Sequence, residues 1–186
     1  TKLQVDALIN CNNEDLNERA GISGQIFVGA GPQLEEACAK LGGCPPGDAK
    51  ATRGFRLPAK HVIHAVGYDF RRPGPWGSGS DVDEDAVVEK LGGLYAKILA
   101  LASKYGRKKL RLVPISAGIF SGSLQSRMPE LTAQALLGAI NMTFGADAAE
   151  DPNFAFLNPA QQRAALGRKV HDGIAQPALV VGHRLR

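Results

Sequence analysis

The stretch Pro114-Ile-Ser-Ala-Gly-Ile-Phe-Ser-Gly122 decides the fold, because it joins an apolar strand to a turn of small residues. A turn of this kind, when it opens toward a helix, lets the backbone approach an anionic ligand. Gly118 and Gly122 can take positive φ angles without a Cβ clash, and backbone amides in that conformation converge on an anion. The turn is therefore predicted to bind phosphate, although a tight strand-to-helix connection without a ligand has the same pattern.

The segment Val5-Asp-Ala-Leu-Ile-Asn-Cys-Asn-Asn13 indicates a second apolar strand, which ends in the carboxamides Asn10, Asn12 and Asn13. A carboxamide pairs a donor with an acceptor, which suits the hydroxyl groups of a ribose. Each Asn taken alone is also typical of a turn or a cap. Ligands of open α/β sheets bind outside the carboxyl ends of strands, so two such strand ends together favour one ligand site. A helix is expected to begin after Gly21.

Strand-like and helical runs alternate along the chain, which is typical of an α/β fold whose sheet is covered on both faces. We predict a three-layer α/β/α sandwich around a central mixed, mostly parallel sheet. Strands are predicted over residues 3–9, 61–66, 110–114 and 154–157, and helices over residues 23–30, 33–41, 84–105, 129–140 and 159–175.

The predicted helix over residues 84–105 has one apolar face and a pair of glycines. Val87, Leu91, Leu94 and Ile98 recur at three- and four-residue steps, which indicates a buried stripe. The pair Gly92-Gly93 is unfavourable in a helix interior and suggests a local irregularity. By contrast, residues 71–80 are rich in Pro and Gly without periodicity, and a surface loop is expected there.

Composition bounds the class of protein. The 186 residues, 44% of them hydrophobic, suffice for one domain with a full core, expected over residues 1–175 with 176–186 as a last strand or a loosely attached end. A net charge of +4 with scattered Lys and Arg is a weak nucleic-acid signal. Three cysteines without metal-ligand spacing suit reduced thiols inside a cell. No apolar run has membrane-spanning length, and a monomer is expected. The start at Thr1, without Met, suggests an excised domain or a processed product.

Other chemical groups give weaker signals. His61 and His64 lie three residues apart on one strand and point to opposite faces, so a metal site is not expected and His64 is interpreted as a core histidine. A general base could come from Glu14, Asp15 or Glu18, although each also fits a helix start or a solvated surface. No sequence context supports a nucleophilic Ser, and the cysteines fit small buried residues.

Several motifs, in order, resemble the macro domain family of ADP-ribose-binding modules. The segment from Val5 to Asn13 is similar to that family's first strand and its Asn, and Ser116-Ala-Gly-Ile-Phe120 resembles its second phosphate loop. Further matches are Gly21-Ile22, Ala30-Gly-Pro32, Leu41-Gly-Gly-Cys-Pro-Pro-Gly-Asp-Ala-Lys50 and Leu57-Pro-Ala-Lys-His-Val-Ile-His-Ala-Val-Gly67. The resemblance spans Thr1 to about Leu166.

The resemblance implies an ADP-ribose site and its residues. It places Asn13 at the distal ribose and the backbone of Gly21 and Ile22 at the diphosphate. The opposite loop consists of Ser116, Ala117, Gly118, Ile119 and Phe120, with Phe120 covering the ribose. Phe156 is expected beside the adenine, and Asn10 is added to the binding set as part of the carboxamide cluster. The expected partner is ADP-ribose or an ADP-ribosylated protein, and no metal or cofactor is expected.

The chain departs from the hydrolytic branch of the family at three places. It has Glu18-Arg-Ala-Gly21 where that branch has a run of glycines, Ser23 where it has an Asp, and Phe27 where it has a His. The family's adenine-binding Asp would fall before Thr1. Hydrolysis of mono-ADP-ribosyl-protein or of ADP-ribose-1″-phosphate, with Asn13 and Asp15 as catalytic residues, therefore stands beside a non-catalytic reader of ADP-ribosylation. A poly(ADP-ribose) or RNA binding module is a third alternative.

Overall fold

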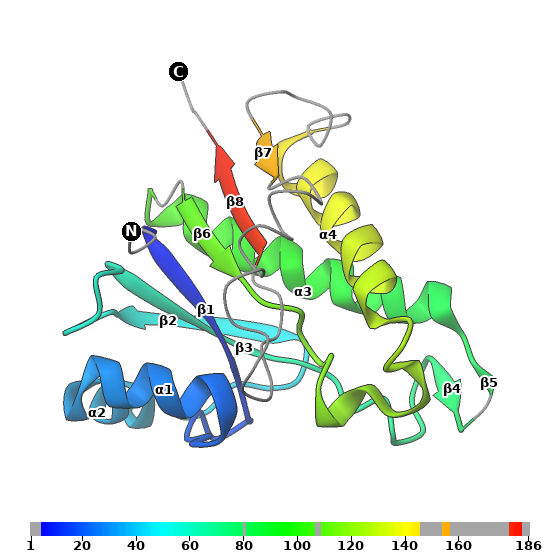
Figure 1. Cartoon of the computed structure of the whole chain (residues 1–186), viewed down its shortest axis with the longest axis horizontal. Helices are drawn as coiled ribbons and strands as arrows, with labels where there is room; N and C mark the ends of the chain where they lie inside the picture. Colours follow the sequence, from blue (N-terminus) through cyan, green and yellow to red (C-terminus); the bar gives the residue numbers. More distant parts are fainter. Residues whose placement is uncertain (1–4, 80, 107–108, 146–153, 157–178, 184–186) are drawn as a thin grey trace, which may run out of the picture.

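The structure is a computed structural model that describes residues 5–79, 81–106, 109–145, 154–156 and 179–183. Its centre is a sheet in the order β2-β3-β1-β6-β8-β7, and a separate small hairpin pairs β4 with β5 (Figure 1). The strands are β1 (Ala7–Asn12), β2 (Asp48–Arg53), β3 (His61–Val66), β4 (Gly77–Ser78), β5 (Asp81–Val82), β6 (Lys109–Leu112), β7 (Phe154–Phe156) and β8 (Leu179–His183).

The sheet is mixed, and most of its strands point one way, as predicted. β1 pairs in parallel with both β3 and β6. β2 runs antiparallel to β3, and β8 runs antiparallel to both β6 and β7. Hence β1, β3, β6 and β7 share one direction, so the carboxyl ends of β1, β3 and β6, the three adjacent central strands, lie at one edge.

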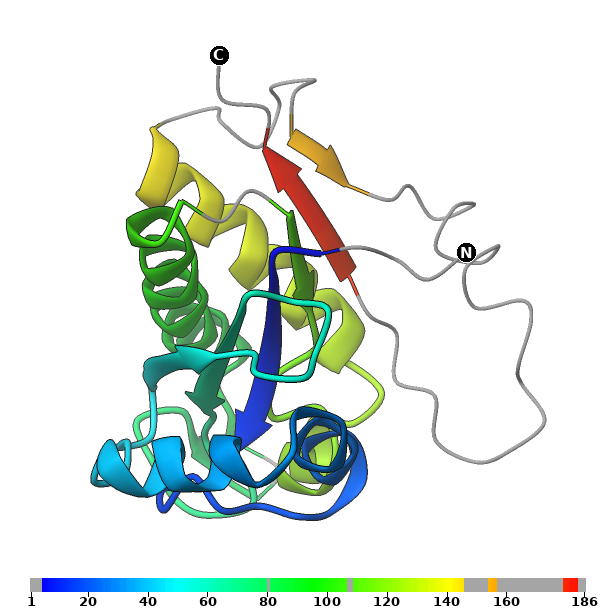
Figure 2. The ribbon, with the colours of Figure 1, turned by 90° about the vertical axis from the view of Figure 1, so that its left-hand side faces the viewer.

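Helices cover both faces of the sheet, which confirms the three-layer prediction. α1 (Gly21–Ala30) and α2 (Pro32–Lys40) lie on one face, and α3 (Glu84–Lys104) and α4 (Met128–Phe144) lie on the other (Figure 2). Alternate residues of β3 divide between the two layers. Val62 and Val66 pack with α1 and α2, whereas Ile63 and Ala65 pack with α3 and α4. The sheet is therefore buried on both sides.

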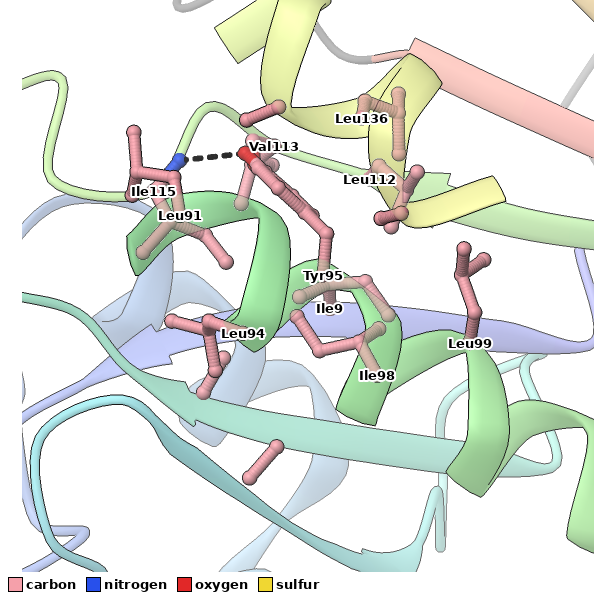
Figure 3. Packing of buried hydrophobic residues seen from close by; sticks show 14 of the residues in the cluster. Ile9, Leu91, Leu94, Tyr95, Ile98, Leu99, Leu112, Val113, Ile115 and Leu136 are labelled. Atoms are coloured by element: carbon pink, nitrogen blue, oxygen red, sulfur yellow. Dashed lines mark hydrogen bonds between the residues drawn. The ribbon is translucent and has the colours of Figure 1, made fainter. Parts of the chain in front are cut away.

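The helix α3 forms the largest part of the core. Asp83 caps its start, where the carboxylate accepts hydrogen bonds from Asp85 N and Ala86 N. Its predicted apolar stripe is buried against β1, β6 and α4, as Figure 3 shows around Tyr95. The predicted irregularity at Gly92-Gly93 is absent, since α3 is continuous. Gly92 faces α4, and a Cβ there would make an ordinary van der Waals contact, 3.4 Å from the Ala135 carbonyl oxygen.

Several segments differ from the sequence-based prediction. β1 continues to Asn12 rather than ending at residue 9, and β2 was not predicted because Asp-Ala-Lys-Ala-Thr-Arg has little strand propensity. Residues 71–80 are not wholly a surface loop, because Trp76 is buried and its ring lies 5.0 Å from that of Phe70. The predicted helix 159–175 lies outside the described residues. Within the described part of the chain, no helix has the length and apolarity needed to cross a membrane.

Candidate ligand-binding cleft

A cleft of about 270 Å³ opens at the edge of the sheet where β1, β3 and β6 end. Two loops form its walls: the first leads from β1 to α1, and the second follows β6. Gly67, directly after β3, contributes to the floor. The lining residues are Cys11, Asn12, Asn13, Glu18, Ala20, Gly21, Ile22, Ser23, Gly67, Val113, Pro114, Ile115, Ser116, Ala117, Gly118, Ile119 and Phe120.

The first loop is folded back onto the end of β1 by hydrogen bonds. Asn12 Oδ1 accepts from the backbone N–H groups of Asn13 and Glu18, both at 2.9 Å. The Ser23 hydroxyl donates to the Glu18 carbonyl at 2.9 Å, and the Glu18 carboxylate accepts from Ala20 N at 2.8 Å. These bonds fix the position of the loop relative to the end of β1, and they place the start of α1 in the wall of the cleft.

The start of α1 carries free positive partial charge. Gly21 takes a φ of +55°, no side chain caps the helix, and its first turn contains no acidic residue. The first N–H groups of an α-helix have no partner within the helix, and the helix dipole adds to their attraction for an anion. Ala20 N is bonded to the Glu18 carboxylate, but Gly21, Ile22 and Ser23 also line the cleft, so their amides are available to a ligand bound there.

The second loop turns at Ser116 rather than at Gly118. Gly118 has φ −93° and does not use the positive φ that a glycine permits, whereas Ser116 has φ +60°. Gly122 has the predicted positive φ of +57°, but it does not line the cleft. The left-handed conformation of Ser116 is supported by its side chain, because its hydroxyl accepts a hydrogen bond from Tyr68 N at 2.9 Å.

Close contact between β3 and the second loop requires a glycine at position 67. A Cβ on Gly67 would lie 2.2 Å from Ser116 Oγ and 2.7 Å from Ile115 Cγ2. The loop is also tied to the segment after β3 at its far end, where Phe70 N donates to the Phe120 carbonyl at 2.9 Å. The second wall of the cleft is thus attached to the sheet at two points.

A buried phenol supports the same wall from behind. The Tyr95 hydroxyl of α3 donates to the Val113 carbonyl at 3.1 Å. It also accepts from Ile115 N at 3.0 Å, the bond drawn in Figure 3. These backbone groups lie just past the end of β6, where the sheet no longer pairs them. Burial raises the pKa of the Tyr95 phenol, so the hydroxyl keeps the proton that it donates.

The structure brings most of the predicted binding residues together. Asn13, Gly21, Ile22 and the whole segment from Ser116 to Phe120 line the cleft. Asn10 does not, because β1 extends past it and its fully buried side chain faces His64. Asp15 lies in an exposed turn and is not a lining residue. The side chain of Phe156 lies outside the described residues.

Lining residues outside the predicted binding set are Cys11, Asn12, Glu18, Ala20, Ser23, Gly67, Val113, Pro114 and Ile115. Asp15 and Glu18 are both close to Asn13 in sequence, and Asp15 was the predicted catalytic residue, but the path of the loop brings Glu18 to the cleft. Asn12 was recognisable as part of the carboxamide cluster. Gly67 directly follows the strand His61–Val66, so its position at a strand end could have predicted that it lines the site.

The cleft offers few chemically reactive side chains, and its lining includes one carboxylate. Glu18 is the acidic side chain among the lining residues. Burial raises the pKa of the Cys11 thiol to about 12, so the thiol is neutral at pH 7 and is a poor nucleophile. Asn13 Nδ2 donates to Asn17 Oδ1 at 2.7 Å, and Asn13 Oδ1 accepts from Asn17 N at 2.9 Å. The Asn13 amide retains one N–H and one lone pair for a ligand.

No group of three or more potential metal ligands occurs within the described ranges.

Comparison with known proteins identifies the family. Residues 9–128 match the sequence model of the Macro domain. A macro domain-containing protein of Methanosarcina mazei is 41% identical over 119 residues, which cover 64% of this chain and 58% of that protein. A protein of Enterobacter cloacae named O-acetyl-ADP-ribose deacetylase is 39% identical over 124 residues, which cover 64% and 63%. The chain thus spans about six tenths of the length of such relatives.

Solved structures give the same result. The Trypanosoma brucei macrodomain, 28% identical, has been solved in complex with ADP and with ADP-ribose. The ADP complex gives a TM-score of 0.60 over 77% of this chain and 55% of that one, and the ADP-ribose complex gives 0.54 over 79% and 51%. The match of residues 9–128 covers most of the chain, and the chain therefore belongs to the macro domain family.

Proposed function

We propose that this chain binds ADP-ribose, or a molecule that carries it, in the cleft between the two loops. The observation that carries the proposal is the position of the α1 amino terminus opposite the segment 116–120 across one cleft, with Asn13 at its side. The Trypanosoma brucei relative, which has the same fold, is known in complex with ADP-ribose.

The electrostatics of the walls suit a diphosphate. Gly21, Ile22 and Ser23 offer the first N–H groups of a helix start, and residues 116–120 line the opposite wall after a left-handed turn at Ser116. Such partial charges attract anions without a metal ion. A doubly charged diphosphate between the two walls is attracted electrostatically by both of them, whereas a neutral sugar of similar size is attracted by neither.

The rest of the cleft suits a sugar. Asn13 keeps one donor and one acceptor for vicinal hydroxyl groups. At the mouth, the side chains of Ile119 and Phe120 are 77% and 38% exposed. Both lie in the lining of the cleft, so a bound ribose would cover apolar surface that water now contacts.

Blocking one wall tests the proposal. Ala20 is an exposed lining residue, and Ala20→Trp places an indole at the cleft with little effect on the core. We expect it to weaken ADP-ribose binding, measured by calorimetry, at least about tenfold, or about 1.4 kcal/mol. The matched control is Ala39→Trp, at an exposed alanine of α2 outside the lining. Equal affinities of the two variants, or no binding by the folded wild type, would contradict the proposal.

A second candidate function is hydrolysis of an ADP-ribose ester, and the position of Glu18 favours it. The Glu18 carboxylate lies in the cleft, held by Ala20 N, where it could take a proton from a water that attacks the ester carbonyl. The products would be a carboxylic acid and free ADP-ribose. Incubation with O-acetyl-ADP-ribose distinguishes the candidates. A catalyst releases acetate and Glu18→Gln loses about 10²-fold or more in rate, while a reader binds the ester unchanged.

A further inference from the structure

A histidine behind the first loop is fully buried and held by polar side chains. His64 lies on the face of β3 that is covered by α1 and α2. Its imidazole faces Asn10 and Asn12 of β1, Thr52 of β2 and Cys38 of α2. The Phe27 ring of α1 is 6.3 Å away. None of these groups carries a charge at neutral pH, so the site is polar but uncharged.

The hydrogen bonds of Asn12 determine the orientation of its amide. Asn12 Oδ1 receives two backbone N–H groups, from Asn13 and Glu18, and these can only donate. The atom between them must therefore be the oxygen, and the nitrogen of the same amide points at His64. Asn12 Nδ2 lies 3.4 Å from His64 Nδ1, and Asn10 Nδ2 lies 3.3 Å from it.

The orientation of Asn12 in turn determines the tautomer of His64. An amide N–H₂ group cannot accept a hydrogen bond, so Nδ1 must be an unprotonated acceptor. The proton of the neutral ring is then on Nε2, which lies 3.0 Å from Thr52 Oγ1 and 3.5 Å from Cys38 Sγ. Burial lowers the pKa of His64 to about 4, which keeps the ring neutral near pH 7.

Asn12 thus links His64 to a wall of the cleft. One end of its amide is anchored on the imidazole, and the other end holds the backbone N–H groups of Asn13 and Glu18. Removing the anchor takes away the hydrogen bond that opposes rotation of the amide on its nitrogen side, and rotation weakens both loop contacts. We propose that His64, which does not line the cleft, is a positioning residue for ligand binding that holds the first loop through Asn12 and its Nδ1 lone pair. The inference rests on the proposed function.

Two substitutions separate positioning from packing. His64→Leu fills the site but has no acceptor, whereas His64→Asn is smaller and can place its Oδ1 near the lost Nδ1. The Leu variant therefore preserves the packing but loses the hydrogen bond to Asn12, whereas the Asn variant packs less well but can keep that hydrogen bond. Thr52→Val is the matched control, because it removes the partner of Nε2 on the side away from the loop.

The readout is hydrogen exchange of the two amides that Asn12 holds, measured by NMR. In His64→Leu we expect Asn13 N–H and Glu18 N–H to exchange about tenfold faster or more, while β3 amides keep their protection. ADP-ribose should bind about tenfold more weakly. His64→Asn and Thr52→Val should stay within about threefold of wild type in both measurements, even where their stability falls.

The inference is overturned if the two amides of His64→Leu exchange at the wild-type rate, or if His64→Asn loosens the loop as much as His64→Leu. Should a variant not fold, NMR of the wild-type imidazole decides, because a proton found on Nδ1 overturns the hydrogen-bond assignment. Exchange that responds as expected in a protein that does not bind ADP-ribose would refute the proposed function and leave the positioning of the loop supported.

Discussion

Replacing Tyr95 with Phe removes one hydroxyl that supports the second wall of the cleft. The change leaves the side-chain volume almost intact but takes away the partner of Ile115 N and of the Val113 carbonyl. All three residues are buried, so water cannot easily replace the hydroxyl. An orphaned buried N–H costs about 1–3 kcal/mol, and the carbonyl adds less because it is more easily tolerated. We expect the free energy of unfolding to fall by about 2 kcal/mol.

Urea denaturation at 25 °C measures this loss directly, and calorimetry should show a melting temperature about 4–8 °C lower. The matched control is Tyr68→Phe, at a half-buried tyrosine of the same chain, for which we expect less than about 1 kcal/mol. The reasoning is refuted if the two variants lose the same stability. It is also refuted if Tyr95→Phe is destabilised while the Ile115 amide keeps its chemical shift and its protection.

Two further predictions follow from the same geometry. Gly67→Ala would place a Cβ 2.2 Å from Ser116 Oγ, so the second loop must move. We expect about 1–3 kcal/mol of destabilisation and weaker ADP-ribose binding; unchanged affinity would show that the contact can relax. The pKa of His64 is lowered from 6.5 to about 4, so the unfolded chain takes up the proton first and stability falls as the pH drops from about 6.5 to 4. At about 1.4 kcal/mol per pKa unit the loss reaches about 3–4 kcal/mol and levels off below pH 4. Urea titrations across this range should show the loss in wild type and not in His64→Leu.

The sequence by itself determined the family and most of the elements. The strand His61–Val66 and the helix beginning at Glu84 follow from apolar periodicity, which depends on near neighbours. The turn after residue 114 followed from its small residues, and both walls of the cleft were expected at strand ends. These are local signals, so they can be read without knowing what packs against each segment.

The tertiary structure decided which polar groups face the cleft. β1 continues to Asn12, so Asn10 is buried against His64, a residue 54 positions away. The bond between Asn12 and the Glu18 amide turns Glu18, and not Asp15, toward the ligand site. The strand β2 forms because β3 offers it an edge, although its own residues favour no strand.

The conformation of the second loop has the same origin. Its left-handed residue is Ser116 and not Gly118, because the N–H of Tyr68, 48 residues away, stabilises the serine hydroxyl in that geometry. Intrinsic preferences of a residue amount to about 1 kcal/mol, and one long-range buried hydrogen bond is worth about as much. Local sequence therefore specifies helices and strands, where many such preferences add up, while single loop positions are decided by the partners that only folding brings near.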